Sequence, residues 1–185
     1  MDLFKTIMST QVLLVILSKE IFDESRTNII KTVVKKDGDI CYVTINKPCI
    51  VLHKKYDELL PEGKKIVYID ATPSAMATKN DSIDCVTINS PANLNDINME
   101  ITKLLGNNSF EIMIFDSVDT LEIYNDFKIV IQFIHSLIGK IRAKDKNIIL
   151  FGIDDKQDST IIKELFMFVD NTMHLSYSKG SILTK

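Results

Sequence analysis

Short apolar runs alternate along the chain with longer segments that have helical periodicity. Each run is bounded by polar residues, glycine or proline, and nearly every position within it is apolar. That pattern is typical of strands that crossover helices bury on both faces. It predicts seven strands of a parallel sheet, at 12–17, 40–45, 65–69, 85–88, 112–115, 147–151 and 171–175.

The segments between these runs predict the helices. Apolar residues fall on one helical stripe between Leu94 and Leu105 and on another between Phe127 and Ile141. Further helices are expected at 24–36, ending before Gly38, at 49–60, and after an N-cap at Ser159. Strands and helices in alternation indicate right-handed crossovers, and therefore a three-layer α/β/α sandwich with a mostly parallel sheet. No linker divides residues 1–185, so one domain is expected, with a mobile surface loop at 71–82.

Composition narrows the class of protein. The chain has 185 residues, of which 45% are hydrophobic and 25% charged, and this excludes disordered and fibrous classes. A net charge of −3 supplies no general field that would attract nucleic acid. The longest apolar run, Val12 to Leu17, is too short to span a bilayer and is followed by Lys19 and Glu20. We therefore expect a cytoplasmic protein without a membrane partner.

The residues that commonly bind metals show no recognisable spacing. Cys41, Cys49 and Cys85 match neither a zinc knuckle nor a redox CxxC motif. The three histidines, at 53, 135 and 174, share no spacing with one another or with a cysteine. The sequence thus predicts reduced, mostly buried thiols and no structural metal.

Polar side chains follow most of the predicted strands, where an open parallel sheet places its ligand crevice. They include Ser18, Asn46, Lys47, Asp70, Asn89, Ser90, Asp116, Ser117 and Asp154. Asp116 ends the buried run 112–115, as does the acid with which P-loop enzymes hold Mg²⁺. A buried strand must also end in something polar, so both interpretations of Asp116 stay open at this point.

Several segments in order resemble those of RecA/KaiC-like ATPases, particularly archaeal KaiC-like proteins of unassigned role. The resemblance runs from about residue 11 to 176 and is carried by 41–48, 87–94, 116–121, 124–126, 147–152, 162–165 and 168–170. It implies an ATP-binding core that often assembles into rings or filaments, with Asp116 as the Walker B acid. It also implies that strand 147–151 lies between strands 12–17 and 112–115.

The phosphate-binding loop departs from that family. Where the family has G-x-x-x-x-G-K-[ST], this chain has Glu20 to Thr27, and only Thr27 is unchanged. Glu20 and Ser25 replace the glycines that let backbone N–H groups curl around phosphates, and Arg26 replaces the lysine. Each acidic residue here would repel a phosphate charge by about 3 kcal/mol at ~6 Å in an effective dielectric of ~20.

The water-activating glutamates of the family are also replaced, by Asn46 and Lys47. We therefore expect no ATP hydrolysis and weak or absent nucleotide binding. A residual nucleotide site would consist of Ser25, Arg26, Thr27, Lys47 and Asp116, and Mg²⁺ would be held by Thr27 and Asp116. No catalytic residue and no other cofactor is predicted.

Three functions are compatible with this pattern. The leading hypothesis is a non-catalytic RecA/KaiC-like domain that acts in regulation, signalling or assembly through a protein partner or its own copies. The alternative is a divergent nucleotide-binding switch without turnover. A third is an accessory factor of DNA recombination, suggested by Lys35-Lys36, Lys54-Lys55 and Lys64-Lys65; no aromatic residues interleave with these lysines, and a solvated surface is favoured.

Overall fold

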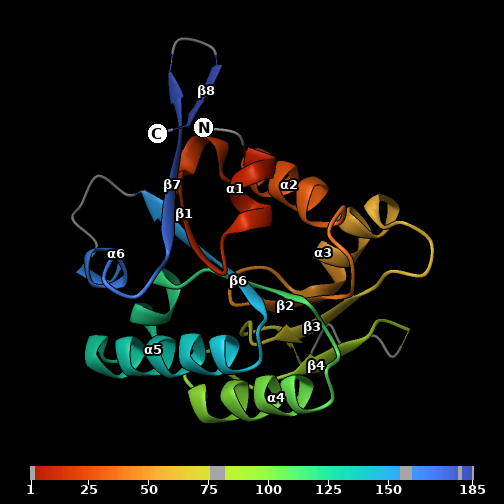
Figure 1. The fold of residues 1–185 in the computed structure, drawn as a ribbon. Helices are drawn as coiled ribbons and strands as arrows, with labels where there is room; N and C mark the ends of the chain where they lie inside the picture. Colours follow the sequence, from red (N-terminus) through yellow and green to blue (C-terminus); the bar gives the residue numbers. More distant parts are fainter. Residues whose placement is uncertain (1–2, 76–81, 155–159, 179–180, 185) are drawn as a thin grey trace.

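An eight-stranded sheet forms the centre of the protein in the computed structural model, which describes residues 3–75, 82–154, 160–178 and 181–184 (Figure 1). The strand order is β4-β3-β2-β5-β6-β1-β7-β8. All pairs from β4 to β7 are parallel, and β8 runs antiparallel to β7. The strands are β1 (Val12–Ser18), β2 (Ile40–Thr44), β3 (Ile66–Asp70), β4 (Cys85–Thr87), β5 (Ile112–Asp116), β6 (Asn147–Asp154), β7 (Asn171–Ser178) and β8 (Ser181–Thr184).

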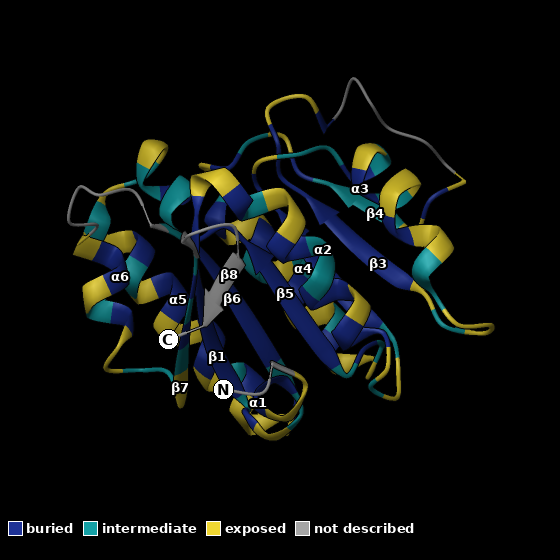
Figure 2. Cartoon of the chain, turned by 90° about the horizontal axis from the view of Figure 1, so that it is seen from above, coloured by how far each residue is buried: buried dark blue, intermediate teal, exposed yellow. Residues whose placement is uncertain are grey.

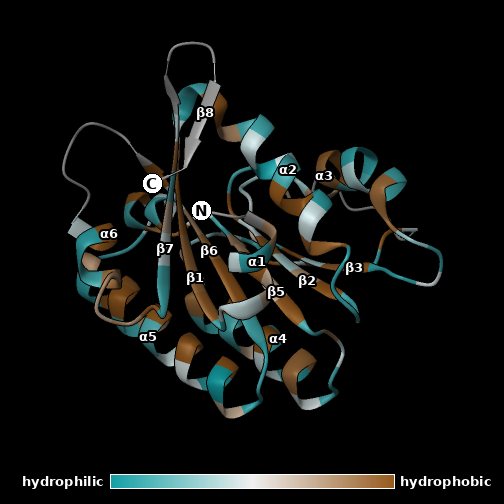
Figure 3. Ribbon diagram, turned by 45° about the horizontal axis from the view of Figure 1, so that its top comes forward, coloured by the Kyte–Doolittle hydropathy of each residue, from teal (hydrophilic) through white to brown (hydrophobic). Residues whose placement is uncertain are grey.

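Helices cover both faces of this sheet and make the three layers (Figures 1 and 3). One face packs against α1 (Leu3–Ser9), α2 (Phe22–Val33) and α3 (Cys49–Tyr56), and the other against α4 (Leu94–Gly106), α5 (Phe127–Ala143) and α6 (Thr160–Leu165). The described part of the chain also contains the short 3-10 helices η1 (Lys19–Ile21), η2 (Asp57–Leu59) and η4 (Asp119–Ile123). Among the residues that the structure describes, no helix is long and apolar enough to cross a membrane.

The three-layer α/β architecture is confirmed, as are the seven predicted strands and the place of β6 between β1 and β5. Neither α1 nor β8 was predicted. The helix expected at 24–36 begins earlier, at Phe22, and ends at Val33. The helix expected at 49–60 ends at Tyr56 and continues as η2. Ser159, the expected N-cap, and residues 76–81 of the expected mobile loop lie outside the described residues.

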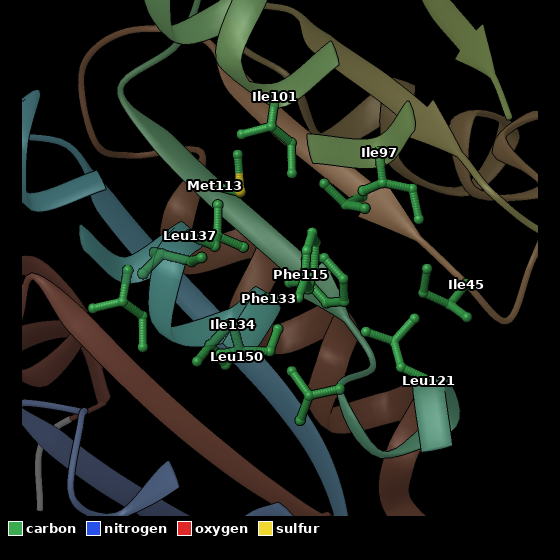
Figure 4. Packing of buried hydrophobic residues seen from close by; sticks show 14 of the residues in the cluster. Ile45, Ile97, Ile101, Met113, Phe115, Leu121, Phe133, Ile134, Leu137 and Leu150 are labelled. Carbon is green, nitrogen blue, oxygen red and sulfur yellow. The ribbon is translucent and has the colours of Figure 1, made fainter. Parts of the chain in front are cut away.

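Alternate residues of the central strands pack into two separate hydrophobic cores, one on each face of the sheet. Along β1, Leu14 and Ile16 face the layer of α4, α5 and α6, whereas Leu13 and Val15 face that of α1, α2 and α3. Every residue of β1, β2 and β5 is buried, while exposed positions gather on the outer sides of the helices (Figure 2). Figure 4 shows one of these cores, where the ring of Phe115 lies 6.0 Å from that of Phe133, centroid to centroid. The sheet thus holds the carboxyl ends of β1, β2 and β5 in fixed relative positions.

Candidate functional site

The segment that follows β1 is helical from its first residues. Lys19 to Ile21 form η1, and α2 begins directly at Phe22, whose backbone N–H donates a hydrogen bond to the carbonyl of Lys19. The hydroxyl of Thr27 donates to the carbonyl of Asp23 at 2.7 Å, one turn earlier in α2. Residues 20–27 are therefore helical, and no extended loop separates β1 from α2.

Arg26 points inward, toward the end of β5. Its Nη1 lies 2.6 Å from Oδ2 of Asp116, and the two side chains are 1% and 0% exposed. Its Nη2 lies 2.8 Å from Oδ1 of Asp23, on the first turn of the same helix. Arg26 thus bridges a buried carboxylate and a surface carboxylate.

Tyr42 of β2 completes the surroundings of Asp116. Its hydroxyl donates a 2.6 Å hydrogen bond to the same Oδ2 that binds Arg26. Oδ1 of Asp116 is buried and has no hydrogen-bond partner among the described residues. The peptide bond between Asp116 and Ser117 is cis.

Electrostatics keeps this buried cluster in one charge state. Burial alone would lower the pKa of the Arg26 guanidinium, but Tyr42 and Asp116 outweigh burial and raise that pKa. Burial, together with the charge of Asp116, raises the pKa of the Tyr42 phenol well above its usual value. At neutral pH the cluster therefore contains a charged guanidinium and a neutral phenol that both donate to one carboxylate oxygen.

Lys47 and Asn46, which follow β2, are tied down separately. Nζ of Lys47 lies 2.6 and 2.7 Å from the two carboxylate oxygens of Asp23, and this contact lowers the pKa of Asp23. Nδ2 of Asn46 donates to Oγ of Ser117 at 3.1 Å. Lys47 is thus linked to Arg26 through Asp23, which forms ion pairs with both side chains.

A crevice of about 570 Å³ lies over these side chains. Three cationic and three acidic residues line it, together with Phe22, Asn46 and Ile153: Lys19, Arg26 and Lys47 against Glu20, Asp23 and Glu24. Opposite charges of equal number leave the lining without a net positive charge.

The structure brings together only part of the predicted site. Arg26 and Asp116 are in direct contact, and Lys47 joins them through Asp23. Thr27 is bonded within its own helix, and Oγ of Ser25 is buried without a hydrogen-bond partner among the described residues. Asp154, expected at the end of β6, has a side chain outside the described residues.

Sequence reasoning missed Tyr42 and Asp119 as parts of this site, and it treated Asp23 only as one of the acidic residues that would repel a phosphate. Asp119 lies in η4, where its Oδ1 accepts a 3.2 Å hydrogen bond from the backbone N–H of Ile153. Burial raises the pKa of Asp119 to about 6. Its place three residues after Asp116 was the available signal, whereas nothing in the sequence indicates that Tyr42 faces Asp116.

The raised pKa of Asp119 predicts a specific pH dependence of stability. A carboxyl group that is harder to ionise when folded favours the folded state at low pH, and this contribution is lost as the pH rises from about 4 to about 6. The loss is about 3 kcal/mol at most. We therefore expect Asp119→Asn to be more stable than the wild-type protein at pH 7 and to lose this advantage at pH 4.

Urea denaturation of both proteins at several pH values measures this difference. Subtracting the two curves removes the contributions of groups that the substitution leaves alone, such as Asp23, whose lowered pKa acts below pH 4. A difference in unfolding free energy that stays constant from pH 4 to pH 7 would contradict the assignment.

Comparisons with known proteins bear on the fold. No protein-family model and no curated protein matches the chain. Among solved structures, the KaiC-like protein PH0186 from the hyperthermophilic archaeon Pyrococcus horikoshii OT3 superimposes with a TM-score of 0.61 over 94% of this chain and 76% of its own, at 12% identity. The flagellar accessory protein FlaH from Methanocaldococcus jannaschii gives a TM-score of 0.63 over 95% and 76%, at 13% identity.

The chain has a RecA/KaiC-like fold. This confirms the fold that the order of segments between residues 11 and 176 implied. The sequence resemblance predicts Arg26 in place of the phosphate-loop lysine and Asp116 as the Walker B acid. The structure shows these two side chains bound to each other.

Proposed function

We propose that this chain is a non-catalytic RecA/KaiC-like domain that acts through protein–protein contacts in regulation, signalling or assembly. The observation that carries the proposal is the buried ion pair between Arg26 and Asp116. It joins the side chains that an ATPase of this fold would direct at the phosphates and at the metal ion.

Mg²⁺ fits poorly at Asp116 in this arrangement. Oδ2 already accepts hydrogen bonds from Arg26 and Tyr42, both at 2.6 Å. A dication on this carboxylate would lie beside a buried guanidinium, and repulsion between cations is strong where water is excluded. Oδ1 of Asp116 has no hydrogen-bond partner among the described residues, but it belongs to the same buried carboxylate, so a cation bound there would also lie beside the guanidinium of Arg26. No step of hydrolysis is therefore assigned to this site.

A triphosphate also lacks a backbone cradle. A helix uses most of its N–H groups for its own hydrogen bonds and leaves only those of its first turn. In α2 the first turn carries Asp23 and Glu24, whose negative charges already complement the helix dipole. An incoming polyphosphate would have to displace or approach these carboxylates.

Neither Asn46 nor Lys47 is suited to activate a water molecule. Lys47 is held by Asp23, and Asn46 donates to Ser117. At neutral pH, neither an amide nor an ammonium group can act as the general base that a carboxylate would provide. This supports a domain without turnover.

The basic residues offer little support for DNA binding. Several are committed to acceptors of the protein itself, which is expected of residues that stabilise the ends of strands and helices. The contacts are Lys36 with Asn147, Lys64 with the carbonyl of Val34, Lys65 with Asp84, Lys140 with Asn98, Arg142 with Asp170 and Lys146 with Glu111.

Exposed apolar side chains supply surface for contacts with a protein. Ile123 and Tyr124, at the end of η4, are 75% and 39% exposed, and Ile129 of α5 is 53% exposed. Large contiguous apolar patches are characteristic of interaction sites, and these three exposed side chains lie close together in the sequence. The segment 123–129 is therefore the contact surface that we assign to the proposed function.

Isothermal titration calorimetry with Mg-ATP tests the proposal. We expect no saturable binding at micromolar protein and nucleotide, because the carboxylate and the cation that would hold the ligand neutralise each other. Binding with a micromolar Kd would contradict the expected loss of nucleotide binding at this site.

A thermal-shift series with other nucleotides tests the alternative hypothesis, in which the chain is a nucleotide-binding switch without turnover. A nucleotide-dependent rise in Tm that disappears in Asp116→Asn would favour a switch. This variant keeps an oxygen that can accept from Tyr42 but leaves the buried guanidinium of Arg26 without its carboxylate. Circular dichroism therefore has to show that Asp116→Asn is folded before its Tm is compared with that of the wild-type protein. A rise that is the same in both proteins would indicate binding away from Asp116.

A further inference from the structure

A second group of chemically reactive side chains lies beneath the start of α3, away from the Arg26 cluster. Cys49 begins α3, Asp70 ends β3 and Cys85 begins β4. One donor atom from each of the three residues lies within 4.8 Å of the other two. Cys49 and Asp70 are 1% and 0% exposed, and Cys85 is half-buried.

We propose that Cys49, Asp70 and Cys85 form a zinc-binding site with two thiolate ligands and one carboxylate ligand. The fourth position of the tetrahedron is left to water or to a group of a partner molecule, since Cys85 reaches the surface. This inference does not depend on the proposed function, because the two sites share no residue.

The donor set suits Zn²⁺ better than Mg²⁺ or Ca²⁺. Sulfur ligands select borderline and soft metals such as Zn²⁺, whereas Mg²⁺ and Ca²⁺ prefer oxygen ligands alone. With Zn–S distances of about 2.3 Å and Zn–O distances of about 2.0 Å, neighbouring tetrahedral donors lie roughly 3.3–3.8 Å apart. Donors already within 4.8 Å need to contract by no more than about 1.5 Å to reach that geometry.

Asp70 keeps a lone pair for a metal. A carboxylate offers about four lone-pair sites. Among the described residues, Oδ1 accepts from the backbone N–H of Thr72 at 2.9 Å and from its hydroxyl at 2.7 Å, and Oδ2 accepts from the backbone N–H of Cys49 alone, at 2.6 Å. One site on Oδ2 therefore remains.

The same hydrogen bonds fix the geometry of the site. The bond from Cys49 to Asp70 attaches the first residue of α3 to the end of β3. Cys85 pairs with Tyr68 in the parallel register of β3 and β4, which holds its strand next to that of Asp70. Outer hydrogen bonds that orient ligating carboxylates are a regular feature of metal sites.

Charge also favours a cation here. Asp70 is fully buried, and no basic side chain in the described part of the chain forms an ion pair with it. A buried carboxylate is costly unless it is paired or binds a metal. Zn²⁺ would compensate two of the three negative charges that one carboxylate and two thiolates carry.

Sequence analysis expected no metal, because the spacing of the cysteines matches no known metal-binding motif. Only the pairing of β3 with β4 and the return of α3 over them bring Cys49 and Cys85 together. Cys41 is buried on the opposite face of the sheet, in the other core. It therefore provides a matched control.

Metal binding by the purified, reduced protein tests the proposal. We compare the wild-type chain, Cys85→Ser and the control Cys41→Ala by native mass spectrometry with Zn²⁺ and by absorption spectroscopy with Co²⁺. We expect one Zn²⁺ per chain, and a thiolate-to-cobalt charge-transfer band, in the wild-type protein and in Cys41→Ala. Cys85→Ser should lack the band and bind Zn²⁺ at least about 100-fold more weakly in a chelator competition.

Circular dichroism checks that all three proteins are folded, which we expect because Cys85 lies on a short, half-buried edge strand. The proposal is overturned if the reduced wild-type protein takes up no zinc at micromolar free Zn²⁺. It is also overturned if Cys85→Ser and Cys41→Ala bind the metal equally well.

Discussion

Replacing Arg26 with Met should lower the free energy of unfolding by about 3–5 kcal/mol, because it leaves the carboxylate of Asp116 buried without its cation. The methionine side chain fills most of the space of the aliphatic part of Arg26, so the loss of stability measures mainly the effect of removing the positive charge. Both side chains of the pair are at most 1% exposed, and water cannot substitute for the guanidinium without opening the core. Urea denaturation followed by circular dichroism measures the change.

Two further variants separate the charge effect from packing. Combining Arg26→Met with Asp116→Asn removes both charges and leaves an oxygen that can accept from Tyr42, so most of the lost stability should return. Lys47→Met breaks the ion pair with Asp23, whose partners are 38% and 57% exposed, and should cost at most about 1 kcal/mol. If Arg26→Met were no more destabilising than Lys47→Met, the buried ion pair would not exist in solution.

Replacing Phe115 with Ala should also destabilise the protein by about 3–5 kcal/mol, through lost burial and the cavity left behind. Phe115 is fully buried on β5, the strand that ends in Asp116, and its ring contacts that of Phe133 on α5 (Figure 4). Thermal and urea unfolding give the change in free energy.

Met99→Ala on α4 is the matched surface control. Its side chain is 59% exposed, so its removal should change the free energy of unfolding by no more than about 0.5 kcal/mol. Similar effects for Phe115→Ala and Met99→Ala would contradict the packing of β5 against α5.

The sequence predicts the layered fold because nearly all the information needed is local. Runs such as 112–115 are apolar at every position, and the stripe from Phe127 to Ile141 is long enough to identify α5. The helix α1 and the strand β8 are short, with seven and four residues, and carry too few turns or alternations to stand out. Their positions depend on tertiary packing and on pairing with β7.

The site is less predictable, because it depends on side-chain direction. Arg26 falls in phase with Ile29, Ile30 and Val33 on the buried side of α2, and this was a readable signal that its guanidinium enters the core. Sequence analysis instead treated Arg26 as the replacement of the phosphate-loop lysine, which would face a phosphate. The convergence of Tyr42 with Asp116 requires the pairing of β2 with β5, in which Tyr42 lies opposite Ile114.

The central position of β1 has a consequence for how the polypeptide is made. Leu14 lies opposite Leu150 on one side and Thr172 on the other, so β1 leaves the ribosome well before either of the strands that flank it. Until β6 and β7 have been synthesised, both edges of this seven-residue strand, which carries no charged side chain, can pair with other nascent chains. The sheet around β1 is therefore completed only once β7 has emerged, and a chain that stops before β7 keeps one edge of this apolar strand unpaired.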